Sequence, residues 1–248
     1  VRFLNKARQE LRESNFDRVV AGYDPGREAL YDAFDIVGLA YKNPGAVSRL
    51  SRYPTFLTLA ERDEFQQIAD DVEFHNLWQG GATVAQLVAH PKVQAITMNA
   101  TLMQEIQGIL VPDLKDLRYF MEHGESQKYA DERILGRWQF DFTASVNHER
   151  RNRSHMSATE VRNLRNKVLP FWGVTLTATI DNKTFLKRGP NTPNSQNAPR
   201  QIAEGTWKRD SGLYRLSIDN REIEAVIEDG NRLIVPWGDY TLVFLRET

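Results

Sequence analysis

The chain has 248 residues, of which 41% are hydrophobic and 26% are charged, as is typical of folded, water-soluble protein. It contains no cysteine, which excludes disulfides, thiolate catalysis and cysteine-based zinc or iron–sulfur sites. The formal net charge is −1, unlike that of a dedicated nucleic-acid binder.

Charge is distributed unevenly along the chain. Residues 1–133 carry 15 Lys and Arg against 20 Asp and Glu, a net charge of −5, whereas residues 134–248 carry 17 against 13, a net charge of +4. This asymmetry favours either docking of the two halves on each other or contact of the second half with an anionic surface.

The first half predicts a series of short helices. Residues 3–20 form a loose apolar stripe, and a second stripe follows Asp24 as N-cap and Pro25 at the first helical position. After residue 41 helix start signals recur about every 8 to 12 residues, which matches no solenoid period. Helices this short are marginal alone in water, so they must pack together. We therefore predict an all-α domain over residues 1–130.

One polar cluster in this half invites a functional interpretation. Asp70, Asp71, Glu73 and His75 place carboxylates and an imidazole close together, as a metal site would. The same carboxylates suit the start of a helix, where negative charge meets the helix dipole. We favour the capping role and expect no metal and no cofactor.

The second half predicts antiparallel strands. Trp138, Phe140 and Phe142 alternate with polar residues, and residues 174–180 alternate apolar residues with threonine. An open meander would leave two edges exposed, and closure into a barrel is the usual remedy. The turn signals that divide the remaining chain into strands are at residues 181–182, 210–212, 219–220 and 229–231.

A single helix is expected between the first two strands. Ser157 and Glu160 form the capping box that opens it, over about residues 157–169. The predicted fold class is therefore α+β, with an N-terminal all-α cluster of short helices followed by an antiparallel β-barrel over residues 131–248.

The barrel half resembles the lipocalins. Gly136-Arg137-Trp138 opens the meander and Arg246 lies in its last strand, as in the lipocalin pattern where the opening Trp packs across the barrel base beside that Arg. Alternation points Arg246 inward, toward Trp138, as a cation–π partner. Gly205-Thr206-Trp207 echoes the opening motif.

The resemblance implies a lipocalin-like barrel, which either is filled by side chains or holds one small apolar ligand. Aromatic residues at strand spacing serve equally well as plain core. The candidate ligand-binding residues are Trp138, Phe140, Trp207, Tyr214 and Arg246.

A second resemblance covers more of the chain. The segments 90–94, 112–117, 128–129 and 135–138 resemble the soluble C-terminal extension carried by some members of the colicin V production protein family of bacterial membrane proteins. No run here approaches 18 apolar residues, and the chain opens at Val1 with a polar amphipathic stretch. We expect a fragment or mature product that follows an upstream transmembrane segment. The resemblance implies membrane association with a periplasmic soluble domain, and it carries no catalytic residues.

The densest basic stretch, residues 148–155 with cations following on the next helix, suits contact with phosphates of lipid headgroups or nucleic acid. Nucleic acid is disfavoured because no aromatic residues interleave the cations to stack on bases. A solvated loop and an exposed helix face would explain the same stretch without a function. The candidates for anionic-surface contact are Arg150, Arg151, Arg153, Arg162 and Arg165.

The chain contains none of the common motifs for a nucleophile elbow, a phosphate-binding loop, a dinucleotide turn or a zinc protease. We therefore predict a non-enzymatic soluble accessory domain of a bacterial membrane or cell-envelope protein. It would act by contacts with its own upstream transmembrane segment and other envelope proteins, or by binding a small ligand. The alternative is a free lipocalin-like carrier of a small apolar ligand.

Overall fold

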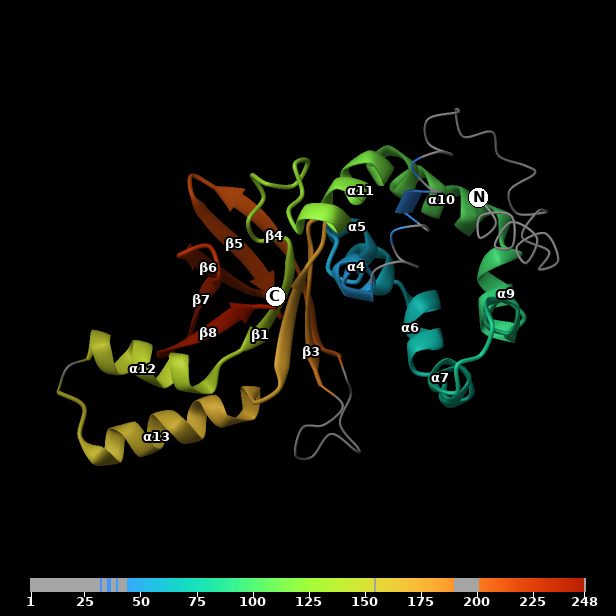
Figure 1. The fold of residues 1–248 in the computed structure, drawn as a ribbon. Coiled ribbons are helices and arrows are strands. Elements are labelled where there is room, and N and C mark those ends of the chain that lie inside the picture. Colours follow the sequence, from blue (N-terminus) through green and yellow to red (C-terminus); the bar gives the residue numbers. More distant parts are fainter. Residues whose placement is uncertain are drawn as a thin grey trace. The chain divides into compact units, whose positions relative to one another are not determined.

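The computed structural model describes residues 44–153, 155–189 and 201–247, together with helical positions 32, 35, 36 and 39 (Figure 1). The predicted helices over residues 3–20 and after Asp24 therefore lie almost wholly outside the described residues. Internal contacts divide the chain into two units, Val1–Lys128 and Tyr129–Thr248. In the described part of the chain no helix is both long and apolar enough to cross a membrane.

The first unit is the predicted cluster of short helices. Prolines begin α4, α5 and α9, and Asp71 and Asn99 cap α7 and α10 by accepting a hydrogen bond from a backbone N–H. Among the helices of this unit that the structure describes, none has more than 11 residues, so burial between helices supplies the stability. The elements are α4 (Pro44–Leu50), α5 (Pro54–Ala60), α6 (Asp63–Ala69), α7 (Val72–Gln79), α8 (Val84–Val88), α9 (Pro91–Thr97), α10 (Ala100–Leu110), η1 (Val111–Asp113) and α11 (Leu114–His123).

Asp116 on α11 connects three parts of this unit. Its carboxylate accepts hydrogen bonds from the hydroxyls of Tyr53 at 2.8 Å and Ser126 at 2.5 Å. It also accepts from the backbone N–H groups of Gln127 at 2.8 Å and Lys128 at 3.0 Å. Burial raises the pKa of Asp116, but the hydrogen bonds outweigh it, so the pKa lies below its usual value. The ionised carboxylate thus joins α11 to the residue before α5 and to the chain after α11.

We expect Asp116 to make the stability of the helical unit depend on pH. A carboxyl with a lowered folded pKa stabilises the fold above its unfolded value of about 3.9, and this contribution is lost as the pH falls through the folded pKa. Asp116→Ala should cost about 2 kcal/mol at neutral pH, a modest value because the carboxylate is partly exposed. The cost should shrink at about pH 3. Native-state amide exchange at both pH values measures the stability cost of Asp116→Ala. A cost independent of pH would contradict a stabilising role for the ionised carboxylate.

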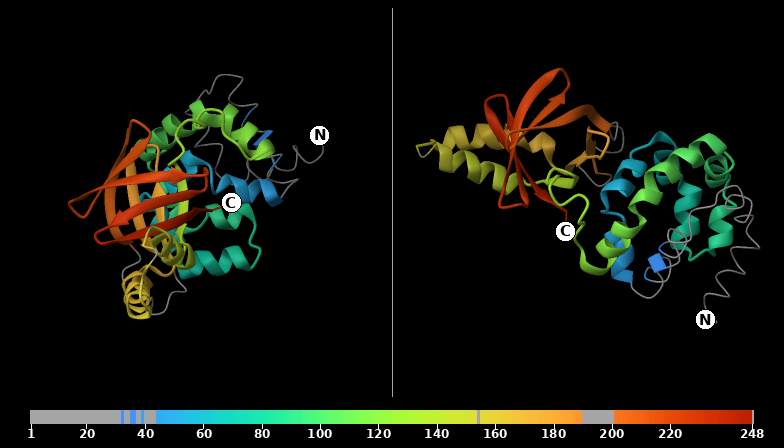
Figure 2. Two further views of the ribbon diagram at one scale, coloured as in Figure 1. Left: turned by 90° about the vertical axis from the view of Figure 1, so that its left-hand side faces the viewer. Right: turned by 90° about the horizontal axis from the view of Figure 1, so that it is seen from above.

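The second unit is a closed antiparallel barrel, as predicted. Each strand pairs with the next in sequence, and β1 pairs with β8 to close the barrel. The ribbons curve around a common interior (Figure 2). The strands are β1 (Gly136–Phe140), β2 (Val174–Ala178), β3 (Lys183–Arg188), β4 (Gln201–Asp210), β5 (Leu213–Ile218), β6 (Arg221–Glu228), β7 (Arg232–Trp237) and β8 (Tyr240–Arg246).

The connection between β1 and β2 differs from the prediction. It contains two helices, α12 (Phe142–Asn152) and α13 (Ala158–Val168), and the short η2 (Leu169–Phe171), where one helix was expected. Phe142 was expected to continue the first strand, but that strand ends at Phe140 and Phe142 begins α12. The physical reason is Asp141, whose carboxylate accepts a hydrogen bond from the Ala144 N–H at 2.7 Å and so caps a new helix.

Candidate functional site

The barrel interior contains the four aromatic ligand-binding candidates. Trp138, Phe140, Trp207 and Tyr214 are between 0% and 7% exposed and belong to one buried cluster. The rings of Trp207 and Tyr214 meet edge to face, with centroids 6.1 Å apart. Both indole N–H groups donate to backbone carbonyl oxygens, at 2.8 and 2.9 Å. The four side chains thus belong to the packed interior, and both indole N–H groups are satisfied within the protein.

Arg246, the fifth candidate, lies at the base of the barrel. Its Cζ lies 4.3 Å from the centroid of the Trp138 ring, the cation–π contact that alternation predicts. The guanidinium donates to the backbone oxygens of Leu135, at 2.9 Å, and Arg133. Burial lowers the pKa of Arg246. These contacts join the last strand to the chain entering the first, so Arg246 has a structural role at the closure of the barrel.

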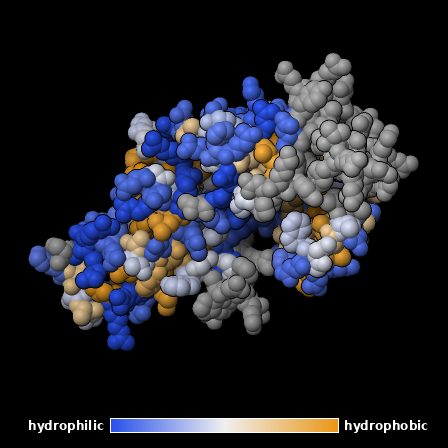
Figure 3. Space-filling view, in the orientation of Figure 1, coloured by the Kyte–Doolittle hydropathy of each residue, from blue (hydrophilic) through white to orange (hydrophobic). Residues whose placement is uncertain are grey.

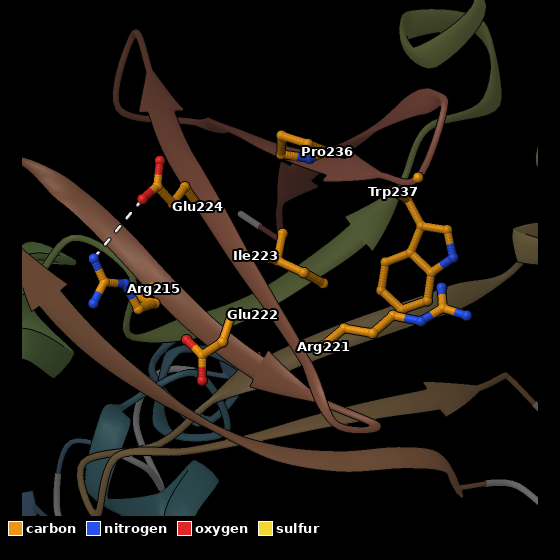
Figure 4. A pocket seen from close by; sticks show the side chains of 8 residues that line it. Arg215, Arg221, Glu222, Ile223, Glu224, Pro236 and Trp237 are labelled. Carbon is orange, nitrogen blue, oxygen red and sulfur yellow. Dashed lines mark ion pairs between the residues drawn. The ribbon is translucent and has the colours of Figure 1, made fainter.

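A hollow of about 650 Å³ opens on the barrel wall between β6 and β7 (Figure 4). The two strands pair only from Val226 with Ile234 toward their turn. Pro236 lies two residues beyond Ile234 on β7, and because proline has no N–H it cannot donate a ladder hydrogen bond to β6. Arg215 faces Glu224 across 3.8 Å, so part of the hollow's charge is compensated from within.

Arg221 supplies the other cation of this hollow. Its Cζ lies 5.4 Å from the centroid of the Trp237 ring, so the guanidinium charge makes a cation–π contact with this ring. In Figure 4 the Arg221 and Trp237 side chains lie alongside each other at one end of the opening. The lining of the hollow therefore has two cations and two carboxylates, with no excess of either sign to select a ligand.

Helices α12 and α13 lie side by side against the barrel (Figure 1). The Ser145 hydroxyl accepts a hydrogen bond from the Val243 N–H at 2.8 Å and fixes α12 to β8. Lys167 pairs with the Asp239 carboxylate, and Arg153 donates to the Asp239 carbonyl oxygen at 2.6 Å. The Lys167 hydrogen bond lowers the pKa of Asp239. A hollow of about 790 Å³ lies among these groups, and their pairing holds both helices to the β7–β8 turn.

The five arginines proposed for anionic-surface contact fall into two groups. Arg150, Arg151, Arg162 and Arg165 are exposed and form no ion pair with any residue that the structure describes. Arg153 instead pairs with the buried Glu149 at 3.2 Å, in addition to its bond to the β7–β8 turn. The structure thus leaves four of the five available to a partner and uses the fifth internally.

The net positive charge of residues 134–248 comes from the helical pair. Residues 142–172 contain six Lys and Arg against two Glu, a net charge of +4, and the rest of residues 134–248 contains eleven of each sign. An anionic surface would therefore be attracted to this part of the barrel unit.

Two large apolar side chains are exposed directly after α13. Leu169 is 54% and Trp172 is 53% exposed. The Trp172 N–H donates to the Leu169 carbonyl oxygen at 3.0 Å, in a tight turn that places the two side chains on the same side. The Trp172 ring also contacts Phe142, with centroids 6.0 Å apart. In Figure 3 the region of the two helices, at the lower left, shows hydrophilic and hydrophobic residues side by side.

In the helical unit, the acidic cluster at residues 70–75 is built around a helix cap. Asp71 accepts a hydrogen bond from the Phe74 N–H at 2.9 Å and pairs with Lys92 at 2.7 Å. The Lys92 hydrogen bond is the main cause that lowers the pKa of Asp71 to about 2. Among the residues that the structure describes, no three His, Asp or Glu side chains gather as metal ligands.

Comparison with known proteins adds one distant structural likeness. No family model matches the chain, and no curated protein matches it. The barrel-containing chain is similar to the crystal structure of a DUF4847 family protein from Bacteroides vulgatus, at 14% sequence identity and a TM-score of 0.28. The match covers 48% of this chain and 96% of that one.

Proposed function

We propose that this chain is a non-enzymatic accessory domain that works by surface contact at a membrane of the bacterial cell envelope. The barrel is its scaffold and not a ligand container. One observation carries this proposal: all five residues expected to bind a ligand have structural roles, four in the packed interior and Arg246 at the base. A carrier needs a pocket that buries most of its ligand, and these side chains occupy the interior where that ligand would lie.

The membrane part of the proposal rests on two supports. The segments that resemble the colicin V production family imply an upstream transmembrane segment, and the helical pair carries the positive charge that suits an anionic surface. In this proposal the partners are that upstream segment and other envelope proteins, and the soluble domain lies on the periplasmic side.

Solvent extraction and native mass spectrometry of the purified chain separate a scaffold from a carrier. We expect no small molecule in stoichiometric amount and no saturable quenching of tryptophan fluorescence by an apolar probe such as 1-anilinonaphthalene-8-sulfonate, because Trp138 and Trp207 are already packed against protein. A stoichiometric ligand that rebinds and quenches this fluorescence would establish the carrier alternative.

Fractionation of native cells tests the location. The full polypeptide that contains this chain should sediment with membranes and be released by detergent, whereas recovery in the soluble fraction would overturn the membrane part of the proposal. Recovery with membranes after a high-salt wash would further point to an anchor stronger than surface charge alone.

A further inference from the structure

We propose that the α12–α13 pair docks on an anionic lipid bilayer, with Leu169 and Trp172 entering the headgroup region and Arg162 and Arg165 contacting lipid phosphates. This inference rests on the proposed function and deepens it by naming the surface that the domain meets. We call residues 162, 165, 169 and 172 the α13 stripe.

The α13 stripe lies along one side of its helix. Positions three and seven residues apart fall on the same face of an α-helix, so Arg162, Arg165 and Leu169 form one row. The tight turn of η2 brings Trp172 onto the side of Leu169. The row therefore runs from two free cations to two exposed apolar side chains.

This arrangement of cations beside exposed apolar side chains suits a membrane interface. Arginine side chains reach phosphates while their stems lie along apolar surface, and tryptophan favours the headgroup region because its ring is apolar and its N–H is polar. The Trp172 ring is held by Phe142 and yet is 53% exposed, so it is positioned before any contact is made. Burying the Trp172 ring in lipid would therefore cost little side-chain conformational entropy.

Charge selects an anionic surface over a neutral one. Arg150 and Arg151 on α12 are also exposed and make no ion pair with the described residues, so four uncompensated cations serve the same pair of helices. Juxtamembrane cations of this kind each strengthen attraction to an anionic leaflet by about fivefold. A nucleic-acid surface would use the arginines and leave Leu169 in water, since bases stack on aromatic rings and not on aliphatic side chains.

The test is sedimentation of the intact chain with vesicles of phosphatidylcholine alone or with about 30% phosphatidylglycerol. We expect binding to the anionic vesicles that weakens as salt is raised, and little binding to the neutral ones. Brominated lipids should quench part of the tryptophan fluorescence in the wild-type chain, and Trp172→Ala should remove that quenching.

Two charge variants make the test specific. Arg162→Ala with Arg165→Ala should weaken binding to anionic vesicles by about 25-fold, as two cations are lost. Arg209→Ala with Arg215→Ala removes the same charge from β4 and β5, beside the turn that joins these strands, and should change binding by less than about twofold. Circular dichroism of each variant confirms that the fold is kept.

Three results would overturn the inference: no binding by the wild-type chain, equal binding to neutral and anionic vesicles, or equal losses in the two double variants. Tighter binding to a single-stranded oligonucleotide than to the vesicles would also overturn it, in favour of nucleic acid. Failure here leaves the proposed function standing if the barrel is free of ligand. A stoichiometric ligand in the barrel would overturn the scaffold role even if the vesicles bind.

Discussion

Trp138→Ala should lower the free energy of unfolding of the barrel unit by about 3 to 5 kcal/mol, the usual loss for a buried aromatic side chain. Trp138 is fully buried. Its removal leaves a cavity next to Leu176, its neighbour on β2, and deprives Arg246 of the ring over which its charge lies. The N–H bond to the Ile134 carbonyl oxygen, at 2.8 Å, is lost as well.

Trp172→Ala is the matched control for this loss. The same side chain is removed, but from a position that is 53% exposed, so the cost should be below about 1 kcal/mol. Urea unfolding of both variants, followed by near-UV circular dichroism, gives the two free energies. Equal costs would show that Trp138 does not anchor the core, and would remove the structural basis of the lipocalin-like resemblance at the barrel base.

The barrel strands were predictable because their signals are local. The turns expected at residues 181–182, 210–212, 219–220 and 229–231 hold residues with positive φ, such as Asn182, Asp219 and Gly230. Asparagine, aspartate and glycine tolerate that conformation better than other residues, so the sequence marks each turn directly. We predicted that the barrel closes because exposed strand edges are unfavourable, and the pairing of β1 with β8 confirms this prediction.

Helix α12 was missed because two local signals compete at its start. Phe142 continues the alternation of Trp138 and Phe140, yet Asp141, which directly precedes Phe142, caps a helix. Three alternating residues are too few to decide between a strand and a helix start. The spacing of Glu149 on α12 and Arg153 at its C-cap, which pair at 3.2 Å, was the further signal that pointed to a helix here.

Some features of the candidate sites could be predicted from the sequence, and others depend on tertiary packing. Free arginines are visible in the sequence as a dense basic stretch. Arg153 is removed from this set partly by its pair with Glu149, four residues before it, and partly by its bond to Asp239, far away in the chain. Whether an aromatic at strand spacing lines a cavity or fills the core depends on side chains from the other strands. Nothing in the sequence marks Leu169 and Trp172 as exposed, because their exposure depends on the tertiary packing.

Gly205→Ala should be the most harmful methyl addition in the barrel, with an expected loss of about 3 kcal/mol. Gly205 lies on β4 opposite Ile218 of β5. A Cβ at this position would overlap the Ser217 carbonyl oxygen and lie 2.9 Å from Ile218 Cγ1. Ile218 is 1% exposed, so its side chain has no free space into which to move.

The obstacle at Gly205 is backbone, and this is why the loss should exceed that of an ordinary overpacked position. A flexible side chain could rotate away, whereas moving the Ser217 carbonyl would separate β4 from β5 inside a closed barrel, where no free edge absorbs the shift. Gly108→Ala is the control, because nothing lies within 4 Å of an added Cβ there and Ala favours α10 by up to about 1 kcal/mol. Thermal unfolding should therefore show opposite signs for the two substitutions. A neutral Gly205→Ala would mean that the two strands do not approach as closely as described, and that the glycine in the Gly205-Thr206-Trp207 motif is not required for the packing of Trp207.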